Sequence, residues 1–196
     1  MKIISGSCRG MPILAPSGQI TRPTSARVRE AVMSILTPLL EENITFVDLF
    51  AGSGAMGIEA MSRGVRRGLF VENDKNALKA LKKNLAEMER RLDKQGITWD
   101  EAQVIPLPAE KAIQKLSRWP AKMIWADPPY AYCKQWLSTI DADSLNKIAA
   151  DEAVFCLEAA WDLKDEIVFC GEQSNTWEKI KERRYGETFI GIWKRK

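Results

Sequence analysis

The stretch from residue 45 to residue 60, TFVDLFAGSGAMGIEA, constrains the fold more than any other part of the chain. A short apolar run is followed by glycines and then by good helix formers, so the stretch predicts a strand, a tight loop and a helix. Its pattern Gly52-x-Gly54-x-x-Gly57 matches a dinucleotide fingerprint, in which glycines let the backbone approach a ligand over a helix N-terminus. Taken alone, this match is weak evidence for a particular ligand.

Two acidic residues narrow the choice of ligand. Asp48 ends the first strand, and Glu72 ends the next apolar run, close to the spacing of about 20 residues at which such an acid binds ribose hydroxyls. A phosphate gains nothing from a nearby carboxylate, whereas a cation does. S-adenosylmethionine carries a sulfonium and an ammonium against one carboxylate, so the two acids favour it over NAD as the cofactor.

Strands and helices alternate along most of the chain. After the first strand and helix, we expect strands at residues 69–72, 102–105, 122–126 and 153–157, and helices at residues 76–92, 110–116, 134–140 and in the region 144–150. Such alternation predicts a doubly wound α/β fold with a mostly parallel sheet. Residues 177–185 and 188–194, joined across Gly186, are typical of an antiparallel hairpin, although the spacing of the first run also fits a helix. The expected sheet therefore has seven strands.

The first 40 residues are expected to form an appendage to a domain of residues 41–196. Two short strands, at residues 2–4 and 11–14, flank a turn that contains Arg9. A helix follows, capped by Thr24 or Ser25 and ending near Pro38. Arg27 and Arg29 fall off its apolar stripe, where they are free to face solvent or phosphate.

Charge is distributed unevenly although the net charge is only +3. Residues 1–40 carry +4 and residues 179–196 carry +5, which leaves −6 for the residues between them. Basic ends on an acidic body suggest a polyanion bound by the two ends of the chain. Charge alone fits a pair of solvated tails equally well.

Several classes of protein are disfavoured by composition. The chain has no histidine, and its four cysteines lie far apart, so we expect neither a metal site nor a histidine-based catalytic triad. Neither a signal peptide nor a run of ~20 apolar residues is present, so no membrane association is expected. These observations favour a reduced, cytoplasmic protein.

The fourth strand runs into Asp127-Pro128-Pro129-Tyr130. Two prolines fix φ twice, so the backbone after Asp127 is stiff. If the Asp127 carboxylate and the Pro128 carbonyl accept the two hydrogens of an exocyclic amino group on a base, the nitrogen lone pair is directed at an incoming methyl group. Tyr130 can stack on that base. In a doubly wound sheet this loop and the glycine loop both lie beyond the carboxyl ends of strands, where ligands collect.

With these motifs in place, the sequence resembles the RsmD family of bacterial methyltransferases. The resemblance covers nearly the whole chain, and it rests on Arg9-Gly10, the Arg22–Glu30 block, the glycine loop, Phe70-Val71-Glu72, Asp-Pro-Pro-Tyr and Tyr185-Gly186. It implies transfer of a methyl group from S-adenosylmethionine to the N2 amino group of a guanine in 16S ribosomal RNA. It also implies a substrate within an assembling small ribosomal subunit, and we expect a monomer.

The resemblance assigns roles to individual residues. Asp48 and the loop Phe50, Ala51, Gly52, Ser53 and Gly54 would hold the methionine end of the cofactor, Glu72 the ribose, and Asn73 and Ala109 the adenine. Asp127, Pro128, Pro129 and Tyr130 would form the catalytic loop. RNA would be bound by Arg9, Arg22, Thr24, Arg27 and Arg29.

Three alternatives remain open from the sequence. Asp-Pro-Pro-Tyr is shared with enzymes that methylate adenine N6, so it does not distinguish the two bases. An NAD-dependent oxidoreductase fits the glycine pattern and Glu72, but not Asp48. A noncatalytic RNA-binding module is disfavoured by the intact loop at residues 127–130.

Overall fold

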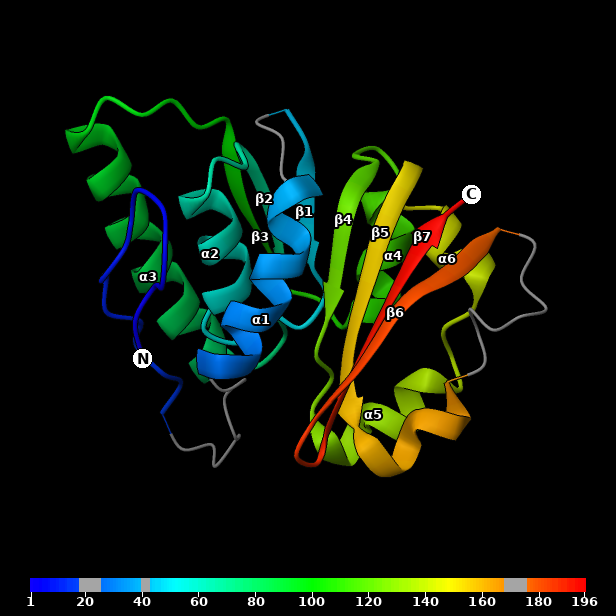
Figure 1. Cartoon of the computed structure of the whole chain (residues 1–196). Helices are drawn as coiled ribbons and strands as arrows, with labels where there is room; N and C mark the ends of the chain where they lie inside the picture. Colours follow the sequence, from blue (N-terminus) through cyan, green and yellow to red (C-terminus); the bar gives the residue numbers. More distant parts are fainter. Residues whose placement is uncertain (18–25, 40–42, 168–175) are drawn as a thin grey trace. The chain divides into compact units, whose positions relative to one another are not determined.

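The structure of the chain, a computed structural model, describes residues 1–17, 26–39, 43–167 and 176–196 (Figure 1). The chain divides into two compact units, Met1–Leu107 and Pro108–Lys196. The described residues include seven strands, three in the first unit and four in the second.

The first unit contains the predicted alternation of strands and helices. Its elements are α1 (Ala26–Leu36), η1 (Thr37–Leu39), β1 (Thr45–Asp48), α2 (Ala55–Ser62), β2 (Arg67–Val71), α3 (Lys75–Lys94) and β3 (Glu101–Ile105). The strands are parallel and lie in the order β3-β2-β1. In register, Asp48 lies beside Phe70 and Val71 beside Ile105, so the carboxyl ends of the three strands meet at one edge.

The N-terminal hairpin is part of the core of this unit. Where the sequence predicts two short strands, the arms pair through one isolated bridge, Lys2 to Pro12, and through backbone hydrogen bonds such as those from the Ile3 and Ile13 amides to the Met11 and Met1 carbonyls. Its apolar side chains, among them Ile3, Cys8 and Met11, share one buried cluster with residues of α2, β2 and α3. Figure 1 shows the hairpin lying along α2 and α3. The hairpin is therefore held by packing as well as by its connection to the chain.

The second unit contains a four-stranded arrangement of its own. Its elements are α4 (Ala109–Leu116), β4 (Ala121–Ala126), α5 (Tyr130–Leu137), α6 (Ala142–Asn146), β5 (Ala149–Ala160), η2 (Trp161–Glu166), β6 (Trp177–Tyr185) and β7 (Thr188–Arg195). The strand order is β4-β5-β7-β6, in which β4 and β5 are parallel and the other pairs are antiparallel. The C-terminal hairpin is thus confirmed, and residues 177–185 are a strand rather than a helix.

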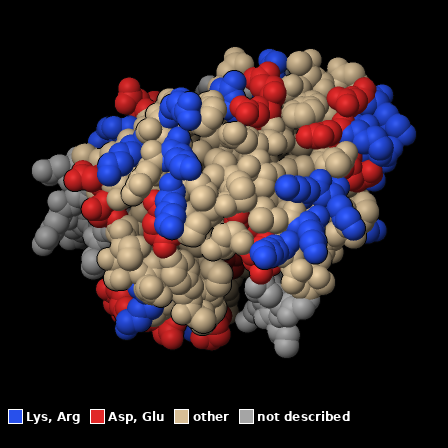
Figure 2. All heavy atoms as spheres, turned by 180° about the vertical axis from the view of Figure 1, so that it is seen from behind, with Lys and Arg blue, Asp and Glu red and all other residues tan. Residues whose placement is uncertain are grey.

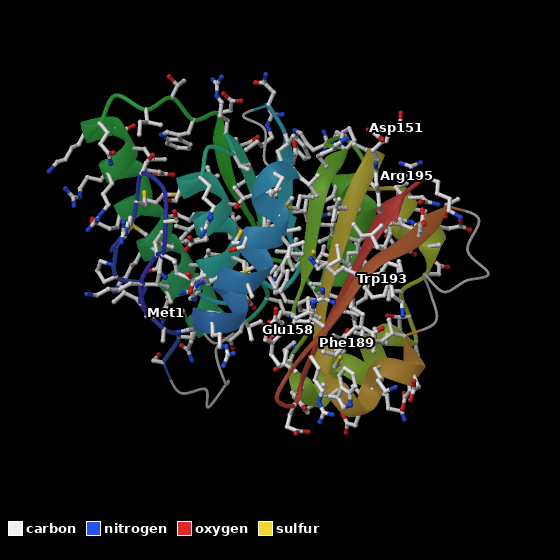
Figure 3. The ribbon with its side chains drawn as sticks, in the orientation of Figure 1. Met1, Asp151, Glu158, Phe189, Trp193 and Arg195 are labelled. Carbon is white, nitrogen blue, oxygen red and sulfur yellow. The ribbon has the colours of Figure 1, made fainter. Side chains whose placement is uncertain are left out.

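Aromatic side chains hold this hairpin to β5. The ring centroids of Phe155 and Trp193 are 5.8 Å apart, and those of Phe155 and Trp177 are 6.4 Å apart with nearly perpendicular planes. Figure 3 labels Phe189 and Trp193 on β7, and their ring centroids lie 6.5 Å apart. Aromatic pairs at these separations add to the free energy gained from apolar burial.

Two boundaries in the second unit differ from the expectation. The helix expected in the region 144–150 is wrong in position, because Asp141 caps α6 by accepting a hydrogen bond from the Ser144 amide at 2.7 Å and β5 already begins at Ala149. The helix expected at 134–140 instead begins at Tyr130, since proline has a φ suited to the start of a helix and Pro129 stands at the N-cap. Tyr130 therefore has a helical backbone.

Candidate functional site

In the first unit, the turn after β1 carries Asp48 and the glycine loop. The Asp48 side chain is almost fully buried, with 1% of its surface exposed. Its Oδ1 accepts a hydrogen bond from the Phe50 amide at 3.4 Å. The loop closes on itself at the start of α2, where the Gly54 amide donates to the Ala51 carbonyl at 2.7 Å. A carboxylate is thus held at the strand end, at the base of a tight turn.

The three glycines of the fingerprint have different physical roles. Gly54 has φ 82°, and a Cβ there would lie 2.5 Å from a methyl carbon of Leu81. A Cβ on Gly57 would lie 2.3 Å from the ring of Phe70, so this glycine allows α2 to pack closely on β2. Gly52 also has a positive φ, of 54°, but a Cβ on it would meet nothing within 4 Å. Unlike the other two glycines, Gly52 therefore faces open space.

Glu72 fixes the glycine loop to the end of β2. One of its oxygens accepts a hydrogen bond from the Gly52 amide at 2.8 Å, and the other accepts from the Asn73 and Asp74 amides at 2.7 and 2.8 Å. A carboxylate has about four lone-pair positions, so one is left for a ligand hydroxyl. The sequence assigned Glu72 to the ribose alone and did not indicate that it also shapes the loop.

These residues suit the predicted cofactor chemically. The structure brings Asp48, the loop from Phe50 to Gly54, Glu72 and Asn73 together at the carboxyl ends of β1 and β2. The side chains here are the carboxylates of Asp48 and Glu72, and the backbone is open at Gly52. Carboxylates attract a cationic sulfonium ligand and repel a phosphate, so these residues fit S-adenosylmethionine better than a dinucleotide.

Asn84 links the same loop to the N-terminal hairpin. Its amide nitrogen donates to the carbonyls of Ser53, at 2.8 Å, and Leu14, at 3.0 Å, and its oxygen accepts from the Leu14 amide at 2.9 Å. Only 2% of Asn84 is exposed. Sequence reasoning missed this residue, although a polar residue beside Leu85 on the apolar stripe of a helix is a signal that could have found it.

Glu59 has a similar role on α2. It is fully buried, and its carboxylate accepts hydrogen bonds from the Ile4 and Ser5 amides at 2.8 and 2.9 Å. The same carboxylate pairs with Arg63, whose Nη1 donates to the Thr37 hydroxyl at 3.1 Å. The hairpin is therefore held at one end by α2 and at the other by α3.

The expectation that Arg29 faces solvent is wrong. Arg29 is 1% exposed, and its guanidinium donates to the Lys2 carbonyl at 2.8 Å and to the sulfur of Met1, labelled in Figure 3, at 3.0 Å. Burial lowers the pKa of Arg29 from its usual value, and the Glu59 carboxylate opposes that shift. The hairpin packs over this part of α1, which a helical pattern considered by itself does not show. Arg9 and Arg27 are exposed, whereas Arg22 and Thr24 lie outside the described residues.

In the second unit, Asp127, Pro128 and Pro129 connect β4 directly to α5. The Pro129 carbonyl accepts hydrogen bonds from the Tyr132 and Cys133 amides at 2.8 and 2.9 Å, so the loop ends as the first turn of α5. Tyr130, the first residue of α5, is 68% exposed. The pKa of Cys133 is raised to about 11, chiefly by burial and then by the Asp127 carboxylate.

A tyrosine ties this loop to α4. The Tyr132 hydroxyl donates a hydrogen bond to Glu110, in the first turn of α4, and burial together with this carboxylate raises the pKa of Tyr132 to about 12. Ala109, the predicted adenine-edge residue, is buried and begins the same helix. The helix that follows the Asp127 loop is therefore linked to the helix that begins at Ala109.

Two further features concern the described part of the chain. No group of three or more His, Cys, Asp or Glu side chains placed to hold a metal ion is found among the described residues. The helices in that part contain none long and apolar enough to cross a membrane. Cys8, Cys133 and Cys156 are buried free thiols.

Comparison with known proteins gives consistent results. A family model described as "Conserved hypothetical protein 95" matches residues 1–194. "Putative rRNA methyltransferase YlbH" of Bacillus subtilis is 38% identical over 66% of this chain and 67% of its own length. "Ribosomal RNA small subunit methyltransferase D" of Escherichia coli K12 is 32% identical over 81% of this chain and 74% of its own length.

Solved structures show the same fold. A structure titled "Putative methyltransferase yhhF from Escherichia coli" has a TM-score of 0.77 and 24% identity, and the match covers 100% of this chain and 98% of that one. At this identity the likeness concerns the fold alone. It confirms the expected α/β, Rossmann-like architecture with an antiparallel C-terminal hairpin.

Proposed function

Because the chain belongs to the RsmD family of ribosomal RNA small subunit methyltransferases, we propose that it methylates the N2 amino group of a guanine in 16S ribosomal RNA. It is an S-adenosylmethionine-dependent methyltransferase. The oxidoreductase alternative is not favoured, because the relatives reported above are named as methyltransferases. Methylation of adenine N6, which the Asp-Pro-Pro-Tyr motif also allows, becomes an outcome of the test.

The proposed cofactor site is supported mainly by the arrangement of residues around Gly52. Glu72 holds the Gly52 amide, the backbone there is open, and Asp48 lies at the end of the neighbouring strand. We assign Asp48 and the loop of residues 50–54 to the methionine end of the cofactor. Glu72 is assigned to the ribose, and Asn73 and Ala109 to the adenine.

The loop of residues 127–130 would position the target base. In this proposal, Asp127 and the Pro128 carbonyl accept the two hydrogens of the amino group, and the exposed ring of Tyr130 stacks on the base. When bound, S-adenosylmethionine supplies an electrophilic methyl group. Two prolines keep the acceptors in place, so the chain contributes mainly positioning and a field matched to the moving charge.

The substrate is proposed to be the assembling small subunit rather than free RNA, with the enzyme acting as a monomer in the cytoplasm. Exposed Arg9 and Arg27 support a role for the N-terminal 40 residues in RNA binding, and the positive charge of that segment is consistent with it. Arg22 and Thr24 are included in this proposal on the family resemblance.

Methyl incorporation into unmodified small subunits and into protein-free 16S RNA tests the function. We expect N2-methylguanine by nucleoside mass spectrometry, with faster transfer to the subunit. N6-methyladenine in its place would overturn the choice of base, and labelling of neither RNA would overturn the function.

Asp127 provides a test of the catalytic loop. Replacing Asp127 with Asn removes a charged acceptor, so we expect kcat to fall about 100-fold or more. Cofactor affinity should stay within about twofold of the wild-type value, since the residue is assigned to the base. Replacing Asp151 with Asn, an exposed carboxylate in β5, is the matched control. Undiminished transfer by the Asp127→Asn variant would remove Asp127 from the mechanism.

A further inference from the structure

One face of α3 carries a row of lysines that the proposed function has not used. Lys75, Lys79, Lys82 and Lys83 occupy positions i, i+4, i+7 and i+8, which lie on one side of a helix. All four are exposed. The buried residues of α3, among them Leu81, Asn84 and Leu85, fall on the opposite side. We call these four residues the lysine stripe.

The lysine stripe is not neutralised within the described part of the chain. No acidic residue occurs between Lys75 and Ala86 in the sequence, and the ion pairs of the described residues include none of the four lysines. The second half of the same helix differs, because Arg90 and Arg91 both pair with Glu87 at 2.7 Å. The positive charge of α3 is thus concentrated in its N-terminal half.

For Lys75, in the first turn of α3, the position is electrostatically unfavourable in the isolated helix. The N-terminus of a helix carries a partial positive charge, and a cation near it costs about 0.3–1 kcal/mol. The first turn of α3 contains no acidic side chain but does contain Lys75. The Asp74 side chain is engaged by the Asn76 and Ala77 amides at 2.9 and 2.8 Å. An external polyanion would relieve this accumulation of charge.

The same helix holds the proposed RNA-binding hairpin. Asn84 bonds Leu14 from the middle of α3, and near the end of the helix the Gln95 side-chain nitrogen Nε2 donates to the Ser7 carbonyl at 3.0 Å. Figure 1 shows the hairpin alongside α3. Figure 2, which views the molecule from behind, shows lysine and arginine side chains gathered in clusters on that rear face. The lysine stripe therefore belongs to the element that positions Arg9.

We propose that the lysine stripe binds the phosphate backbone of the RNA substrate and extends the surface that begins at the N-terminal hairpin. This inference rests on the proposed function, because it names part of the surface that holds the RNA. Lysine ammonium groups are compact charges that contact phosphates without reading the sequence. The stripe therefore contributes to affinity and orientation, and it leaves the choice of guanine to other residues.

The chain offers a closely matched control. Lys79 and Lys83 are an exposed i, i+4 pair on α3, and Lys111 and Lys115 are an exposed i, i+4 pair on α4. None of the four takes part in an ion pair among the described residues. Replacing either pair with glutamine removes the same charge, so the two double variants differ only in where the charge is lost.

The test measures RNA binding and methyl transfer for both double variants as a function of salt. Each phosphate contact contributes about 0.7–0.9 to the slope of log affinity against log salt, so the Lys79→Gln, Lys83→Gln variant should lose about 1.4–1.8 from that slope. Its KM for RNA should rise about 10-fold near physiological salt, with cofactor affinity unchanged. The Lys79→Arg, Lys83→Arg variant should retain wild-type RNA affinity.

Two results would overturn the proposal. A wild-type KM for RNA in the Lys79→Gln, Lys83→Gln variant would show that the lysine stripe is merely solvated. An equal loss in the Lys111→Gln, Lys115→Gln variant would show a general effect of net charge. Failure of the proposed function is distinguishable, because the wild-type protein would then transfer no methyl group to small-subunit RNA at all.

Discussion

The Glu72 carboxylate and the Gly52 amide are joined by a hydrogen bond of 2.8 Å, although they are 20 residues apart in the chain. This bond makes one acid responsible for two properties of the site. The Glu72 carboxylate holds the glycine loop against the end of β2. After its three hydrogen bonds to backbone amides, the same carboxylate has one lone-pair position left for a ribose hydroxyl. The candidate cofactor site is therefore organised by a residue that also belongs to it.

Replacing Glu72 with Gln tests this double role. The amide keeps one oxygen but directs an N–H group either at the Gly52 amide or at the Asn73 and Asp74 amides, so one side of the network loses its acceptor. We expect cofactor affinity to fall about 10-fold, equivalent to about 1.4 kcal/mol. Titration calorimetry measures this affinity. Glu101→Gln on β3 is a control, and equal cofactor binding by the two variants would contradict the assignment.

Asn84 should affect both folding and cofactor binding. Asn84→Asp keeps an acceptor for the Leu14 amide but places a carboxylate against the carbonyls of Leu14 and Ser53. We expect the free energy of unfolding to fall by about 1–3 kcal/mol, with weaker cofactor binding at neutral pH than in Asn84→Ala. Denaturant unfolding and cofactor titration of both variants check this. If the aspartate variant binds the cofactor as well as wild type, Asn84 does not position the glycine loop.

Substitutions of Arg29 and Arg27 should have different effects, the first on the stability of the fold and the second on RNA binding. Arg29→Ala removes a buried side chain and a donor to the Lys2 carbonyl, so the free energy of unfolding should fall by about 2–4 kcal/mol. Arg27 is exposed, so Arg27→Ala should change stability by about 0.5 kcal/mol or less and raise KM for RNA severalfold. Thermal unfolding and RNA titration of each variant would reveal the opposite pattern if Arg29 bound RNA directly.

Because the pKa of Tyr132 is raised, we expect the free energy of unfolding to fall at alkaline pH. Its pKa in the folded protein is about 12, above the usual value near 10, because of burial and the adjacent Glu110. The unfolded chain loses this proton first, so the stability contribution is complete below about pH 10 and disappears as the pH rises toward 12. Unfolding of wild type and Tyr132→Phe between pH 9 and 12 measures it. The variant should lose less stability across this window, and parallel curves would contradict the prediction.

Much of the fold and part of the site followed from local pattern. The periodicity of apolar residues and the turn-forming residues located the strands, because buried parallel strands are short apolar runs bounded by residues that break secondary structure. The glycine loop, with Asp48 and Glu72, was predicted from the same local signals. The start of α5 and the position of α6 were misjudged, since proline and Asp141 move helix starts by only a few residues. The hairpin itself was predicted, but the choice between a strand and a helix for residues 177–185 depended on pairing with β7, which in turn pairs with β5. Local pattern does not encode such pairing.

The amino-acid sequence by itself determined the order of the elements, the acidic character of the cofactor loop and the proline-stiffened Asp127 loop, because these depend on residue type and near neighbours. Only the tertiary structure decided the hydrogen-bond partners of polar residues that the fold buries or brings together. In the structure, Arg29 is buried beneath the hairpin and donates to the Lys2 carbonyl. Asn84 donates to the carbonyls of Leu14 and Ser53, and Glu72 accepts a hydrogen bond from the Gly52 amide. A buried polar group takes whichever partner packing brings within hydrogen-bonding distance, and packing joins residues that lie far apart in the chain.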